Sequence, residues 1–98
     1  MSTKLLSTTA EELLPRSRTR KSLIFQNEDT TDAIFLKRER VGTPTVSSSD
    51  HDHRLGPGGI LTLNDGTDGK EPTQDRWTAV AAANTPRISF FETEDIIR

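Results

Sequence analysis

The stretch Arg-Lys-Ser-Leu-Ile-Phe-Gln-Asn at residues 20–27 decides the fold class of this chain. Polar residues 28–31 follow it at once, and a second apolar stretch, Asp-Ala-Ile-Phe-Leu-Lys, occupies residues 32–37. Two short apolar runs joined by a short polar connector are typical of a β-hairpin. We therefore predict one strand in each run and a hairpin between them.

The same alternation of short apolar runs and turn residues continues toward the carboxyl end. Residues 56–59, Gly-Pro-Gly-Gly, precede Ile-Leu-Thr-Leu at 60–63, and Asn-Thr-Pro at 84–86 separates the runs 76–83 and 88–91. Short runs bounded by glycine, proline and asparagine indicate strands. We predict strands in 60–63, 76–83 and 88–91.

The second run, residues 32–37, has apolar side chains on both of its faces. Ala33 and Phe35 fall on one face of a strand, and Ile34 and Leu36 fall on the other. Strands of this kind are covered on both sides, as in a sandwich or at a subunit contact. Together with the absence of long helical periodicity, this pattern predicts an all-β fold, a small antiparallel β-sandwich or jelly-roll-like barrel.

Residues 41–59 and 64–74 are rich in glycine, proline, serine and aspartate, so we predict that both are loops. Val41 and Val46 remain candidates for a short edge strand in the first loop.

His51-Asp52-His53, in the first of these loops, has groups that bind zinc, and histidine also changes charge near neutral pH. No third ligand is evident nearby, so we interpret the segment as a solvated loop in preference to a metal site or a pH-sensitive contact. Residues 64–69, Asn-Asp-Gly-Thr-Asp-Gly, are similar to part of a calcium loop but lack its closing glutamate, and they suit a tight turn. We expect no metal and no cofactor.

The chain has 98 residues, of which 31% are hydrophobic, and it has no cysteine. Such a chain can form only one modest core, and without cysteine it has no disulfides to stabilise it. Oligomerisation is the remaining way to gain stability. We predict an extended amino-terminal arm at residues 1–19 and a single β domain at residues 20–98. Within the arm, residues 7–14 fit either a short helix stopped by Pro15 or an extended segment, and we favour the extended form.

The net charge is −2, with basic residues gathered at 16–21 and 37–40. No aromatic side chain alternates with these arginines to stack on bases, so we do not expect nucleic-acid binding. A solvated strand edge or a docking surface for an acidic partner explains the basic groups better. No run of apolar residues is long enough for a signal peptide or a membrane span, so we expect no membrane association.

Trp77 is the only tryptophan, and we interpret it as a core anchor or an interface residue in preference to a platform for a sugar or base. The sequence contains no nucleophile elbow, no phosphate-binding glycine loop and no His-Glu-x-x-His motif. We therefore expect no catalytic residues, and we do not expect an enzyme.

The order of several short motifs resembles the small β-structured accessory proteins of tailed-bacteriophage virions. These motifs are Leu-Leu-Pro at 13–15, Ser-Leu-Ile-Phe-Gln-Asn at 22–27, Gly-Gly-Ile-Leu-Thr-Leu at 58–63, Ala-Val-Ala-Ala at 79–82 and Ile-Ser-Phe-Phe-Glu at 88–92. The resemblance covers residues 13–92, and its motifs mark strand ends and turns. Lys-Arg-Glu-Arg at 37–40 departs from the small residues and glycine of the usual pattern.

The resemblance implies a capsid decoration or cement protein that binds the major capsid protein and stabilises neighbouring subunits. We expect a homo-oligomer on the capsid surface of a virion, made in the host cytoplasm. Its predicted contact residues are Leu5, Leu6, Leu13, Leu14, Arg16, Arg18, Arg20, Trp77, Phe91, Ile96 and Ile97. The alternatives are a carbohydrate- or receptor-binding module of a virion spike, with Trp77 and loops 50–55 and 64–75 as its site, or a head–tail or tail adaptor.

Overall fold

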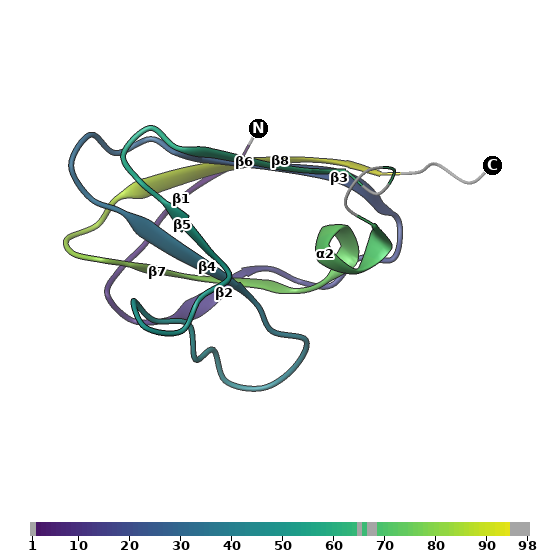
Figure 1. Ribbon diagram of the computed structural model, residues 1–98, viewed down its shortest axis with the longest axis horizontal. Coiled ribbons are helices and arrows are strands. Elements are labelled where there is room, and N and C mark those ends of the chain that lie inside the picture. The colour runs from purple at the N-terminus through teal and green to yellow at the C-terminus, as the bar shows by residue number, and fades with distance from the viewer. Residues whose placement is uncertain (1, 65, 67–68, 95–98) are drawn as a thin grey trace.

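A computed structural model describes residues 2–64, 66 and 69–94 (Figure 1). Within these residues the chain forms eight strands and one short helix. The strands are β1 (Ser2–Leu5), β2 (Glu11–Leu14), β3 (Arg20–Asn27), β4 (Ile34–Arg38), β5 (His53–Leu55), β6 (Ile60–Asn64), β7 (Trp77–Ala81) and β8 (Arg87–Glu94), and the helix is α2 (Lys70–Gln74).

The strands form two four-stranded antiparallel sheets that face each other. Sheet I has the order β1-β8-β3-β6, and sheet II has the order β2-β7-β4-β5. The chain forms one long hairpin that turns back between β4 and β5. Its two arms pair as β1–β8, β2–β7, β3–β6 and β4–β5. That hairpin is rolled up so that β3 also pairs with β8 and β4 with β7. This topology is a jelly roll, and it confirms the predicted all-β sandwich.

The hairpin predicted between the first two apolar runs is wrong, although both runs are strands. β3 lies in sheet I and β4 in sheet II, so residues 28–33 cross from one layer to the other. Leu23 and Phe25 reach the core from one side, and Ile34 and Leu36 reach it from the other. Local spacing located the strands, but burial of both apolar faces determined which strands pair.

The segment predicted to be an amino-terminal arm is instead part of both sheets. β1 pairs with β8, from Ser2 opposite Phe90 to Leu5 opposite Arg87. β2 pairs with β7, and Leu6, Leu13 and Leu14 are buried in the core that the two sheets share. The extended form favoured for Leu13 and Leu14 is confirmed. Three leucines give this segment enough apolar surface to be held in the core.

The core between the sheets is centred on Trp77, which is 1% exposed. Its ring meets Phe25 edge to face, with the centroids 5.6 Å apart, and its Nε1 donates a hydrogen bond to the carbonyl of Pro72 at 2.9 Å. Pro72 belongs to α2, which lies between the two layers at one end of the sandwich (Figure 1). The helix, in a segment predicted to be a loop, closes this end of the core.

Arg20 fixes the same end of the sandwich, and its side chain is 1% exposed. Its Nε donates to Glu92 Oε2 at 2.6 Å, and its Nη2 donates to the Pro15 carbonyl at 2.8 Å. Its Nη1 donates to the carbonyls of Thr73 and Asp75 at 3.3 and 3.1 Å. A buried guanidinium is tolerated because each of its donor nitrogens has an acceptor.

Residues 39–52 form a long loop that extends beyond sheet II in Figure 1. Val46 is buried, whereas Val41 is exposed, and neither belongs to a strand. The strand in this region is β5, which the sequence did not indicate because it is only three residues long. No helix in the described ranges is long and apolar enough to cross a membrane.

Candidate functional site

The outer face of sheet II is covered by the chain's own loop. Phe35 and Val80 project from the outer face of the sheet, and Val46 from the loop packs on them with Ala10 beside it. Beside this cluster a depression of about 260 Å³ remains, with Thr8, Ser47 and Ser48 on its lining. Burial of the apolar side chains attaches the loop to the sheet.

Glu39 holds the other part of this loop to sheet II. Its carboxylate accepts hydrogen bonds from the hydroxyl of Thr78 at 2.6 Å and from the backbone N–H and hydroxyl of Thr45. Lys37 Nζ lies 3.8 Å from Glu39 Oε1. Burial opposes ionisation of this carboxyl, but the bonds from Thr45 and Thr78 and the charge of Lys37 outweigh it. The pKa of Glu39 is therefore lowered to about 2.

Lys37 connects the loop to β4 through a second ion pair. Its Nζ lies 2.6 Å from Asp50 Oδ2 and donates to Thr45 Oγ1 at 3.1 Å. The hydrogen bond to Asp50 is the main cause that raises the pKa of Lys37. The loop is thus attached both by apolar packing and by charged groups.

The outer face of sheet I is exposed, in contrast with that of sheet II. Phe91 on β8 lies opposite Ile24 on β3, and Phe91 is 42% exposed. Ile60 on β6 and Leu5 on β1 are 61% and 57% exposed. Hydroxyl groups surround them, including a hydrogen-bonded pair formed by Ser22 and Thr93. Sheet I therefore presents a broad face with several large apolar side chains, which is suited to contact with a partner.

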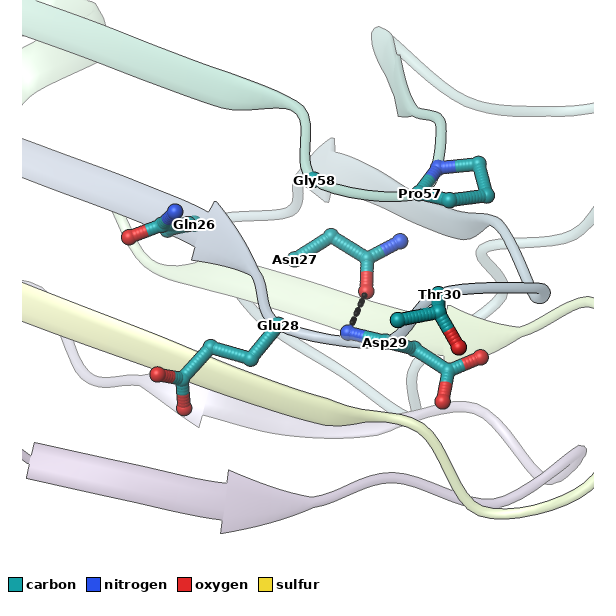
Figure 2. A pocket seen from close by; sticks show the side chains of 7 residues that line it. All are labelled: Gln26, Asn27, Glu28, Asp29, Thr30, Pro57 and Gly58. Carbon is teal, nitrogen blue, oxygen red and sulfur yellow. Dashed lines mark hydrogen bonds between the residues drawn. The ribbon is translucent and has the colours of Figure 1, made fainter.

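A pocket of about 460 Å³ lies at one end of the sandwich, between the β3–β4 and β5–β6 connections (Figure 2). The buried Asn27 holds both connections. Its Nδ2 donates to the carbonyls of Asp32, Leu55 and Gly56 at 2.8, 3.0 and 3.1 Å, and its Oδ1 accepts from the Asp29 N–H at 3.0 Å. All the hydrogen bonds of this amide maintain the walls of the pocket.

Asp29 forms the adjoining turn. Its Oδ2 accepts from the backbone N–H groups of Asp32 and Thr31 at 2.6 and 3.2 Å and from the Thr31 hydroxyl at 3.1 Å. The bond from Asp32 is the largest cause that lowers the pKa of Asp29. In Figure 2 the carboxylates of Glu28 and Asp29 point away from Pro57 on the opposite wall. The acidic groups thus shape the turn and do not converge on one point.

The two histidines lie on opposite sides of sheet II. The His51 ring packs on Phe35 in the outer cluster at a centroid distance of 4.7 Å, and its Nδ1 lies 3.1 Å from the Ser47 carbonyl oxygen. The His53 ring packs on Trp77 in the core at 5.9 Å. No group of three potential metal ligands comes together in the part of the chain that the structure describes. Of the calcium-like segment, residues 65, 67 and 68 lie outside the described residues.

The predicted contact residues divide into buried and exposed sets. Leu6, Leu13, Leu14, Arg20 and Trp77 are buried in the chain itself, so the prediction that they contact a partner is corrected: the core and the end of the sandwich bury them first. Leu5, Arg16, Arg18 and Phe91 are exposed and remain available. Ile96 and Ile97 lie outside the described residues.

Sequence reasoning missed the residues that organise these surfaces. Asn27 and Asp29 had a usable signal, because asparagine and aspartate side chains commonly form turns by accepting a hydrogen bond from the backbone N–H two residues further on. Glu39 had none, since it stands within a basic run and its bond to Thr78 joins residues that are distant in sequence. Comparison with protein-family models, with curated proteins and with solved structures found no match.

Proposed function

We propose that the protein is a non-enzymatic structural protein of a virion, which decorates the capsid and reinforces contacts between neighbouring subunits of the major capsid protein. The observation that carries the proposal is the difference between the two outer faces. Sheet II is covered by residues 39–52, whereas sheet I exposes Leu5, Ile60 and Phe91. The resemblance to virion accessory proteins supports the viral assignment. The jelly-roll fold supports it by analogy, because this fold is frequent among capsid proteins.

The exposed face of sheet I suits attachment to a regular shell. A broad surface with separated apolar side chains forms individual contacts of limited strength. When a shell presents several copies of the partner close together, such contacts add through effective concentration. Phe91, near the middle of the sheet, is then the side chain whose loss affects attachment most.

The proposal is tested by co-sedimentation of the protein with particles from which it has been removed. We expect Phe91→Ser to weaken attachment by about tenfold or more, which corresponds to loss of an aromatic contact. Val41→Ser is the matched control, because Val41 is 86% exposed but lies on the loop of sheet II. Equal attachment of both variants and the unaltered protein would refute a role for this face.

A second candidate function is carbohydrate or receptor binding, and the pocket of Figure 2 is the observation in its favour. The site would be Gln26, Thr30 and Pro57 rather than Trp77, because Trp77 is buried. Binding on a glycan array that Gln26→Ala abolishes, with the fold retained, would support this function over capsid attachment.

A further inference from the structure

The register of sheet I identifies the side chains on its outer face. Leu23 and Phe25 on β3 point into the core, so the alternate residues of this strand point outward. Residues that lie opposite each other on neighbouring strands share a face, and this places two rows across the sheet. One row is Thr62, Ile24 and Phe91, and the next is Ile60, Gln26 and Ser89.

Charge is nearly absent from this outer face. Among the outward positions of the paired strands that the structure describes, Arg87 alone is charged, although 29% of the residues in the chain are charged. Lys4 of β1 turns the other way and donates to the Glu12 carbonyl in sheet II. Glu92 of β8 also turns away and pairs with the buried Arg20. The face is therefore uncharged over almost all of its area.

The charged residues nearest to this face stand at its ends. Arg87 is the first residue of β8, and Lys21 is the second residue of β3. Because β3 and β8 are antiparallel, these two residues lie at opposite ends of the face. An uncharged centre with a polar rim is typical of a protein–protein interface.

We propose that the outer face of sheet I docks on an uncharged, apolar patch of the capsid protein, and that burial of apolar surface, not charge, drives the attachment. This inference rests on the proposed capsid function and specifies the chemistry of the partner. A charged group on the partner would lose its hydration against this face and would find no opposite charge there, which is costly. An uncharged patch avoids this cost and gains from the burial of Ile24, Ile60 and Phe91.

The size of the face favours a shell over a second copy of the chain as the partner. Four strands about 4.8 Å apart, each presenting about 20 Å of its length, give roughly 400 Å² per partner. Stable protein–protein interfaces bury about 800 Å² per partner. This face alone is too small to hold a dimer firmly, whereas a shell presents neighbouring subunits that add further contacts.

The salt dependence of attachment tests this inference separately from the capsid function. Particles from which the protein has been removed are mixed with the full chain at NaCl concentrations from about 0.05 to about 0.5 M, and bound protein is measured by co-sedimentation. The dissociation constant should change by less than about threefold, because salt screens charge pairs and the face has almost no charge. A rise of about tenfold or more would overturn the inference and leave the capsid function standing. Failure to attach at every salt concentration would overturn both.

A charge of either sign at Thr62 tests the chemistry of the partner directly. Thr62 is exposed and lies opposite Ile24, in the row that contains Phe91. Thr62→Lys and Thr62→Glu should each raise the dissociation constant by about tenfold or more, since either charge meets an uncharged patch. Thr62→Val keeps the shape of the side chain without a charge and should attach at least as tightly as the unaltered protein. Opposite effects of lysine and glutamate would indicate a charged partner and overturn the inference.

Thr43→Lys is the matched control, because Thr43 is an exposed threonine on the loop that covers sheet II. It should attach like the unaltered protein, and a loss equal to that of Thr62→Lys would overturn the inference. In analytical ultracentrifugation, the free Thr62 variants should have the same state of association as the unaltered protein. Self-association that Thr62→Lys and Thr62→Glu both abolish would assign the face to a second copy and would also overturn the inference.

Discussion

Arg20 shows how a single residue can have opposite roles in sequence and structure. In the sequence it belongs to a basic group at 16–21 that suggests a docking surface. In the fold it is buried and joins Pro15, Glu92 and the residues around α2. No local pattern distinguishes it from Arg16 or Arg18, because three of its four acceptors come from segments that are distant in sequence. Only tertiary structure identifies a buried arginine of this kind.

Replacing Arg20 should therefore destabilise the protein strongly. Arg20→Met leaves Glu92 without its ion pair and three carbonyls without a donor, so we expect a loss of about 3 kcal/mol in the free energy of unfolding. Urea unfolding followed by Trp77 fluorescence measures it. Arg18→Met, at an exposed position of the preceding loop, should change the stability by less than about 0.5 kcal/mol. Similar losses for the two variants would contradict the role given to Arg20.

Glu39 should make stability depend on pH in the acid range. Its pKa is lowered from 4.5 to about 2 in the folded protein, so its contribution is complete above about pH 4.5. That contribution is lost as the pH falls from 4.5 toward 2, and its upper bound is about 3 kcal/mol. Glu39→Gln should be less stable at neutral pH and should lose less stability across this interval. If the unfolding free energies of the two proteins changed equally with pH over this interval, the lowered pKa of Glu39 would be contradicted.

The strands illustrate which features a short sequence window can predict. The strands at residues 20–27, 60–63 and 88–91 were predicted because short apolar runs between turn residues are typical of strands. β5 and α2 were missed, since three residues and five residues carry too little periodicity. Pairing between strands was also beyond local patterns: β3 and β4 are neighbours in sequence but belong to different sheets.

The first two strands provide a test of this arrangement. Deletion of residues 2–12 removes β1, the buried Leu6 and the first half of β2. We expect the truncated chain to lose cooperative thermal unfolding, because the edges of both sheets and part of the core are absent. Leu5→Ser, at an exposed position of β1, should leave the midpoint nearly unchanged. A truncated chain that unfolds cooperatively would restore the original interpretation of this segment as an arm.

The whole molecule combines a fold class that the sequence predicts with surfaces that it does not. Alternating short runs and the absence of helical periodicity were sufficient for an all-β sandwich. The exposed face of sheet I was only partly predicted: Leu5 and Phe91 were named, whereas Ile60 was not. Burial determines this division, since Leu6 and Trp77 look as suitable for contact as Phe91 until the two sheets enclose them.

The copy number of the protein in purified virions tests the proposed capsid function most directly. Quantitative mass spectrometry against the major capsid protein gives this number. A protein that reinforces contacts between capsid subunits must be present at many equivalent positions, so we predict a copy number comparable to that of the major capsid protein. A few copies per particle, as at a single vertex, or absence from the particle would contradict that function.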